Sequence, residues 1–108
     1  MLHAIARLGG YAIIPAPVLA EVSRGRRAAG VARIVQRHEV VSTDRRIAER
    51  AGQLLERCRL GSEHAVDAFV AATAIELGRA VILTGDVRDL RRLTGAAPGV
   101  IVRSLVDA

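Results

Sequence analysis

The segment from His64 to Leu90, HAVDAFVAATAIELGRAVILTGDVRDL, constrains the fold of this chain more than any other. Its first part has apolar residues three or four positions apart, which predicts a helix over 64–77 that is covered on most sides. Gly78 is suited to the left-handed conformation that ends a helix. The apolar run 80–84 is typical of a parallel strand buried on both faces, and we expect a short helix over 87–94 to follow.

Two acids of this segment are candidate functional residues. Asp67 lies at the edge of the apolar helix face next to small residues, which lets its carboxylate approach the sheet. Asp86 follows a buried strand, and ligands of open α/β sheets bind at the carboxyl ends of strands. The alternatives are a favourable interaction of Asp67 with the positive end of its helix, and an N-cap role for Asp86. Asp89 is a weaker candidate, because a carboxylate in a first helical turn is common.

Length and composition predict one cytoplasmic domain. The chain has 108 residues and 51% hydrophobic residues, which predicts a single domain over 1–108 and argues against disorder. Its apolar runs are too short to cross a bilayer, so we expect no membrane association. The single cysteine, Cys58, cannot form an internal disulfide, and the first ten residues show no signal-peptide pattern, so a reducing cytoplasm is expected.

All 16 basic residues are arginines, and with 11 acids they give a net charge of +5. Arginine binds phosphate bidentately, which suits a nucleic acid, although an acidic protein partner or a GC-rich coding bias would account for the same composition. Aromatic residues make up only 2%, which argues against a surface that stacks on bases. The segment 23–30 is either a basic loop that contacts phosphates or a solvated linker. The candidate RNA-binding residues are Arg24, Arg26, Arg27 and Arg88.

The rest of the chain predicts further alternation of helices and strands. In order, we expect a helix end over 1–8, a strand over 11–14, helices over 17–22 and 31–37, a strand over 39–42, a helix over 45–59 and an edge strand over 100–102. Asp44 is interpreted as the cap of its helix and not as a ligand. Glu21 lies at the border of an apolar helix face; the alternative is an ordinary solvated glutamate.

This order predicts an α/β fold with a largely parallel, doubly wound sheet, right-handed crossovers and helices on both faces. Such a sheet would bring Glu21, Asp67 and Asp86 to one rim. Three neighbouring carboxylates repel one another unless a cation neutralises them, and oxygen ligands favour Mg²⁺ or Mn²⁺. In an arginine-rich protein, that combination points to hydrolysis of phosphodiester bonds.

Other chemistries are less consistent with the sequence. Ser62 is not part of a nucleophile elbow, and the chain has no glycine-rich phosphate loop. His3, His38 and His64 are too scattered along the sequence to predict a metal site. A phospho-receiver domain would need a lysine near its acids, and this chain has no lysine.

Three blocks of sequence, 14–22, 65–74 and 83–90, resemble PIN-domain proteins, and more narrowly the VapC toxin ribonucleases of bacterial toxin–antitoxin pairs. The resemblance implies a Mg²⁺- or Mn²⁺-dependent endoribonuclease. It assigns metal binding and catalysis to Glu21, Asp67 and Asp86, with Asp89 as an auxiliary metal ligand. It also implies RNA as substrate, a cognate antitoxin with an acidic segment as partner, and a homodimer.

The chain departs from the family pattern at its beginning. The family starts with a strand that ends in a catalytic aspartate, and neither is recognisable here. We therefore expect the central strand to be missing and the position between the strands 11–14 and 80–84 to be empty. The explanations left open are a start codon placed too late, a truncated remnant, or a gap filled by another chain. The alternative function is a catalytically impaired remnant that binds an antitoxin or RNA.

Overall fold

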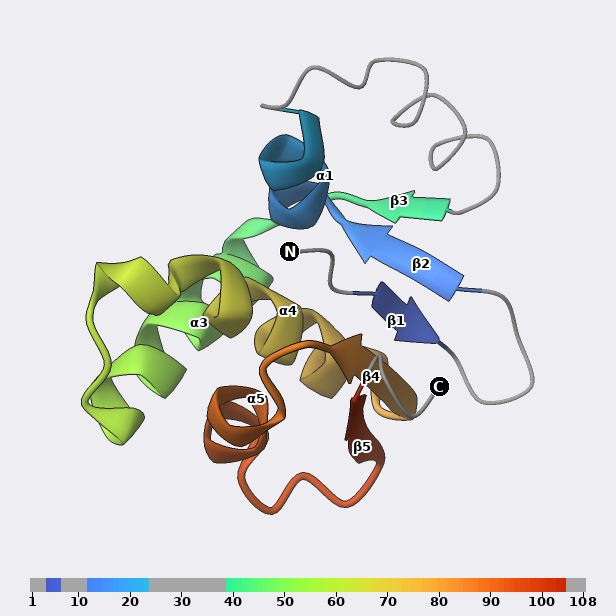
Figure 1. Ribbon diagram of the computed structural model, residues 1–108. Helices are drawn as coiled ribbons and strands as arrows, with labels where there is room; N and C mark the ends of the chain where they lie inside the picture. Colours follow the sequence, from blue (N-terminus) through green and yellow to red (C-terminus); the bar gives the residue numbers. More distant parts are fainter. Residues whose placement is uncertain (1–3, 7–11, 24–38, 105–108) are drawn as a thin grey trace.

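The computed structural model describes residues 4–6, 12–23 and 39–104 of the chain, which form five strands and several helices (Figure 1). The elements are β1 (Ala4–Ala6), β2 (Ala12–Pro15), α1 (Ala16–Ser23), β3 (Glu39–Val41), α3 (Arg45–Cys58), a 3₁₀ turn (Ser62–His64), α4 (Ala65–Leu77), β4 (Ala80–Thr84), α5 (Val87–Thr94) and β5 (Val100–Ser104).

The five strands form one sheet with the order β3-β2-β1-β4-β5. β2 is parallel to β3 and β4 is parallel to β5, whereas β1 is antiparallel to both of its neighbours. Four strands therefore run in one direction and end at the same edge of the sheet. Ala4, at the start of β1, pairs with Leu83, and Ser104, at the end of β5, pairs with Thr84, so both also lie at this edge.

The central strand corrects three expectations. The prediction of a helix end over 1–8 is wrong for residues 4–6, because these form β1. The central position of the sheet is occupied, since Ile5 pairs with Ile13 on one side and with Ile82 on the other. The sheet is consequently mixed and not largely parallel. Both inner strand edges need hydrogen-bond partners, and this tertiary requirement outweighs the weak helical pattern of a three-residue segment.

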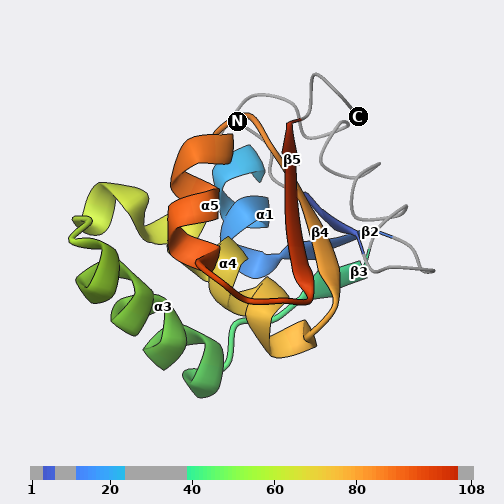
Figure 2. The same ribbon diagram turned by 90° about the horizontal axis from the view of Figure 1, so that it is seen from below.

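Helix α4 is the centre of the core, as its sequence predicts. It packs against β2 and β4 and against the helices α1, α3 and α5. Its buried alanines lie among side chains such as Val70 and Ile82, which are fully buried. The four described helices contact one another through α4, and Figure 2 shows α3, α4 and α5 on the same side of β4 and β5. Among the described residues no helix is found on the other face, so the doubly wound arrangement stays a prediction.

Most predicted elements are confirmed, with small shifts of their bounds. The strand expected over 11–14 is observed as β2, the one over 39–42 as β3, and β5 extends two residues beyond the predicted 100–102. Asp44 caps α3, because its carboxylate accepts a hydrogen bond of 2.9 Å from the backbone N–H of Ile47. Gly78 ends α4 with a φ of 86°. The predicted helix 31–37 lies outside the described residues.

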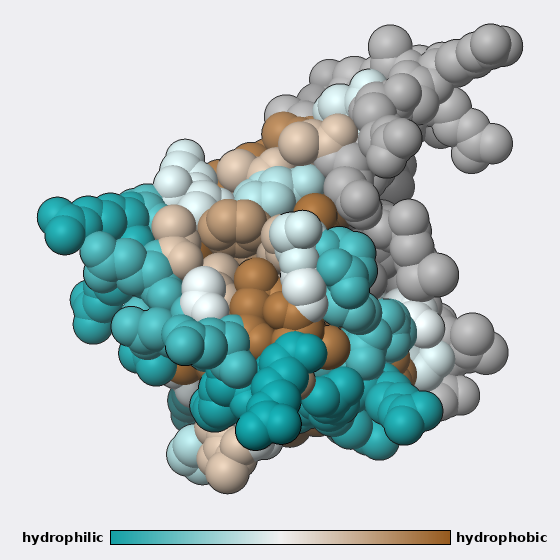
Figure 3. Space-filling model, turned by 90° about the vertical axis from the view of Figure 1, so that its left-hand side faces the viewer, coloured by the Kyte–Doolittle hydropathy of each residue, from teal (hydrophilic) through white to brown (hydrophobic). Residues whose placement is uncertain are grey.

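Polar residues cover most of the outer surface of the described helices. Figure 3 shows the side of the molecule on the left of Figure 1, where hydrophilic residues surround a smaller hydrophobic area. Arginines are among the exposed residues of α3 and α5, for example Arg45, Arg46, Arg57 and Arg92. None of the helices that the structure describes is long and apolar enough to cross a bilayer.

Candidate metal centre

The end of β4 fixes the backbone at Asp86. Thr84 is fully buried, and its hydroxyl oxygen accepts a hydrogen bond of 2.9 Å from the backbone N–H of Asp86. The Asp86 carboxylate in turn accepts a hydrogen bond of 3.4 Å from the backbone N–H of Asp89, which makes it the N-cap of α5. One carboxylate oxygen of Asp86 is engaged in this cap. The side chain is partly exposed at the edge of the sheet where the parallel strands end.

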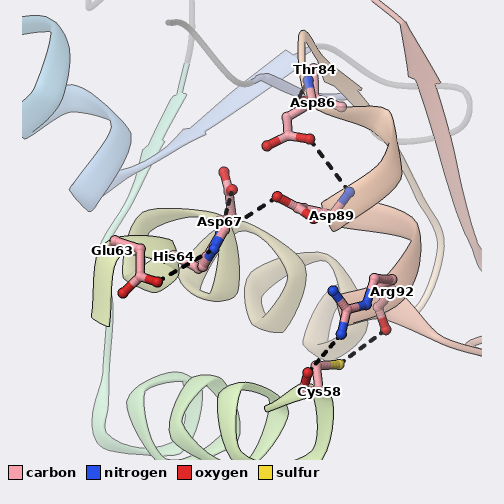
Figure 4. Close-up of polar contacts among 8 residues, drawn as sticks. All are labelled: Cys58, Glu63, His64, Asp67, Thr84, Asp86, Asp89 and Arg92. Carbon is pink, nitrogen blue, oxygen red and sulfur yellow. Dashed lines mark hydrogen bonds and ion pairs between the residues drawn. The ribbon is translucent and has the colours of Figure 1, made fainter. Parts of the chain in front are cut away.

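Asp67 approaches the same region from the first turn of α4. Its side chain is only 14% exposed. Ala68, Ala71 and Ala74 are fully buried, and their small size brings this part of α4 close to its neighbours. Helices α4 and α5 also pack against each other. Figure 4 shows the carboxylates of Asp67, Asp86 and Asp89 around a common region between the two helices.

His64 joins the two aspartates of this region. Its Nδ1 atom lies 3.5 Å from Oδ2 of Asp89 and 4.0 Å from Oδ2 of Asp67. One ligand atom from each of the three residues lies within 4.8 Å of the other two, and all three side chains are partly buried. The opposite ring nitrogen, Nε2, lies 3.8 Å from a carboxylate oxygen of the exposed Glu63. His64 therefore lies in a possible metal-binding group with two aspartates, whereas His3 and His38 lie outside the described residues.

The donor atoms of this group suit a divalent cation. Two partly buried carboxylates within a few ångströms of each other repel, and a cation between them removes that repulsion. Two ligands bound to one ion at about 2.1 Å can be at most about 4.2 Å apart, and both distances from the imidazole are shorter than that. All three ligand atoms lie within 4.8 Å of one another, close to the separation that ligands of one ion have. The residues present thus fit a metal.

The other predicted site residues are described only in part. Glu21 belongs to α1, which follows β2 at the same edge of the sheet and packs against α4. The side chain of Glu21 is outside the described part of the structure, so its convergence with Asp67 and Asp86 stays a prediction. Arg88 is exposed in the first turn of α5, between the two acids Asp86 and Asp89 in sequence. Arg24, Arg26 and Arg27 lie outside the described residues.

An α/β fold with acids and a histidine gathered at the carboxyl ends of its strands is typical of proteins that bind a ligand at that edge of the sheet. The comparison with protein families gives this class a name: the PIN domain family model matches residues 2–96. The chain belongs to the PIN domain family. Members of this family are typically metal-dependent nucleases. No curated protein and no solved structure shows a significant match to the chain.

Proposed function

We propose that this chain is a Mg²⁺- or Mn²⁺-dependent endoribonuclease that hydrolyses RNA phosphodiester bonds. The observation that carries the proposal is the position of Asp67 and Asp89, which lie with His64 at the edge where the parallel strands end. Membership of the PIN domain family supports the same conclusion. Asp86 faces the same region from the end of β4 (Figure 4).

Asp67, Asp86 and Asp89 would hold the metal, with Glu21 as the further ligand that the family resemblance implies. When bound, a divalent cation lowers the barrier to hydrolysis by activating water and neutralising charge on the phosphodiester. The chain's own contribution is to hold the acids in place. The cap hydrogen bond fixes Asp86 relative to Asp89, and the packing of α4 against α5 fixes Asp67 relative to both.

The arginines supply the second part of the proposal. Arg88 is exposed in the first turn of α5, next to Asp89 in sequence, where its guanidinium can pair with an RNA phosphate. Arg24, Arg26 and Arg27 would extend this basic surface. We further propose that the protein is the toxin of a type II toxin–antitoxin pair, acting in the cytoplasm as a homodimer. An acidic segment of the cognate antitoxin would then compete with RNA for the same arginine side chains.

The test is cleavage of a labelled single-stranded RNA with Mg²⁺ or Mn²⁺, comparing the wild type with Asp67→Asn. We expect the substitution to lower cleavage at least 100-fold, because it removes a ligand charge and leaves the fold intact. Asp44→Asn is the matched control, since asparagine is also a good N-cap and Asp44 lies at the start of α3. Equal cleavage by wild type and Asp67→Asn would contradict the proposal.

One observation favours a second candidate function. The central strand β1 has the sequence Ala-Ile-Ala and supplies no carboxylate to the edge that carries the acids. A PIN domain with fewer acids would bind metal more weakly and could serve as a non-catalytic partner of RNA or of an antitoxin. RNA binding by gel shift without metal-dependent cleavage, unchanged by Asp67→Asn, would support this second function over the first.

A further inference from the structure

His64 contributes a nitrogen donor to a centre otherwise made of oxygen donors. Its Nδ1 atom faces the carboxylates of Asp67 and Asp89 at 4.0 and 3.5 Å. The imidazole is 25% exposed, and His64 is both the last residue of the 3₁₀ turn and the N-cap residue of α4, so the backbone on both sides of it is helical. From this position of the imidazole, we infer that His64 is a metal ligand and that it makes the centre selective for a transition metal such as Mn²⁺ over Mg²⁺. This inference rests on the proposed metal-dependent function.

The chemistry of the donors gives the direction of the selectivity. Mg²⁺ binds almost entirely through oxygen and keeps several waters, so an imidazole adds little to its affinity. First-row transition metals accept imidazole nitrogen readily. Replacement of one oxygen donor by Nδ1 of His64 therefore raises the affinity for Mn²⁺ more than the affinity for Mg²⁺.

The surroundings of the other ring nitrogen support a ligand role for His64. Histidines that bind metals commonly direct the second nitrogen to a carboxylate, which fixes the tautomer and the orientation of the ring. Here Nε2 lies 3.8 Å from Oε1 of Glu63, whose side chain is 72% exposed and free to adjust. Glu63, His64 and the two aspartates thus form a continuous chain of groups from solvent to the centre (Figure 4).

The experiment measures metal binding directly, without cleavage. Calorimetric titrations of the full chain with Mn²⁺ and with Mg²⁺ give the affinity ratio of the two ions for the wild type, His64→Gln and His38→Gln. We expect His64→Gln to weaken Mn²⁺ binding about tenfold or more and Mg²⁺ binding less than twofold. His38→Gln is the matched control and should leave the ratio unchanged. Circular dichroism of each variant establishes that it is folded.

A spectroscopic measurement tests the ligand assignment on the wild type itself. Pulsed electron paramagnetic resonance of bound Mn²⁺ should show coupling to ¹⁴N, and this coupling should persist in His38→Gln and vanish in His64→Gln. Binding of both ions with an unchanged ratio and no ¹⁴N coupling would overturn the role of His64 and leave the proposed function standing. Binding of neither ion to the wild type would overturn both.

Discussion

The carboxylate of Asp86 accepts a hydrogen bond from the backbone N–H of Asp89, with 3.4 Å between Oδ1 and N. The same side chain is therefore the N-cap of α5 and an acid at the carboxyl end of β4. The two interpretations of Asp86 that the sequence left open, cap and functional acid, are compatible. One carboxylate oxygen accepts the hydrogen bond from the helix, and the charged carboxylate still faces the region of Asp67 (Figure 4).

Substitutions at Asp86 should separate these two roles. Asp86→Asn keeps a good capping side chain but removes the charge, so we expect weaker Mn²⁺ binding with little change in thermal stability. Asp86→Ala removes both, and should also lower the free energy of unfolding by about 1 kcal/mol. Calorimetry and thermal unfolding of both variants measure the two effects. Equal stability of the two variants would mean that the cap contributes nothing.

The segment from α4 to α5 could be predicted because its local signals agree with its tertiary environment. The helix period, Gly78 and the apolar strand all indicate the same structure, and the caps Asp44 and Asp86 stand at the helix starts. The first residues could not be predicted in this way. Three residues carry little pattern of their own, and their strand conformation follows from pairing with β2 and β4, which are distant in sequence.

The loop before β4 and the loop before β5 are in close contact, and this contact gives a second prediction. A Cβ atom at Gly99 would overlap the carbonyl oxygen of Gly78, next to the hydrogen bond of 2.9 Å between Ala80 N–H and the Gly99 carbonyl. We expect Gly99→Ala to destabilise the protein by about 1–3 kcal/mol, measured by urea unfolding. Gly52→Ala is the control. It lies in α3 with no atom within 4 Å of the added Cβ, and it should stabilise the chain by about 0.5–1 kcal/mol.

The central position of β1 can be tested through its backbone. Ile5→Pro removes an N–H from a strand that is paired on both sides and leaves a carbonyl of a neighbouring strand without its donor. The expected loss of stability is about 1–3 kcal/mol, with faster amide exchange in β4. Ile5→Val changes the side chain and keeps the backbone donor, so it should have a much smaller effect. Unchanged exchange in β4 after Ile5→Pro would contradict the pairing.

The ends of α3 and α5 are joined by reciprocal hydrogen bonds. Arg92 donates to the carbonyl of Cys58 at 2.7 Å, and the Cys58 thiol donates to the carbonyl of Arg92 at 3.3 Å. Arg92→Gln should therefore lower the free energy of unfolding by about 0.5–1.5 kcal/mol in urea titrations. Arg103→Gln, at an exposed position in β5, should be neutral. A neutral result for Arg92→Gln would show that water replaces the lost donor at no cost.

The candidate site was predictable in its acids and not in its histidine. Asp67 and Asp86 follow from the positions of a helix and a strand end, which the sequence pattern indicates. The group formed by His64, Asp67 and Asp89 depends on the packing of α4 against α5, and no local pattern encodes that contact. The spacing of three residues between His64 and Asp67, which puts them on one side of the first helical turn, was the available signal.

The direction of β1 has a practical consequence for handling this protein. Since Ala4 pairs with Leu83 and Ser104 pairs with Thr84, β1 starts and β5 ends at the edge of the sheet that carries Asp86. An affinity tag fused a few residues before Ala4 or after Ser104 would be tethered close to the acids. A polyhistidine tag there would compete for the same ions, so metal titrations call for tag-free protein.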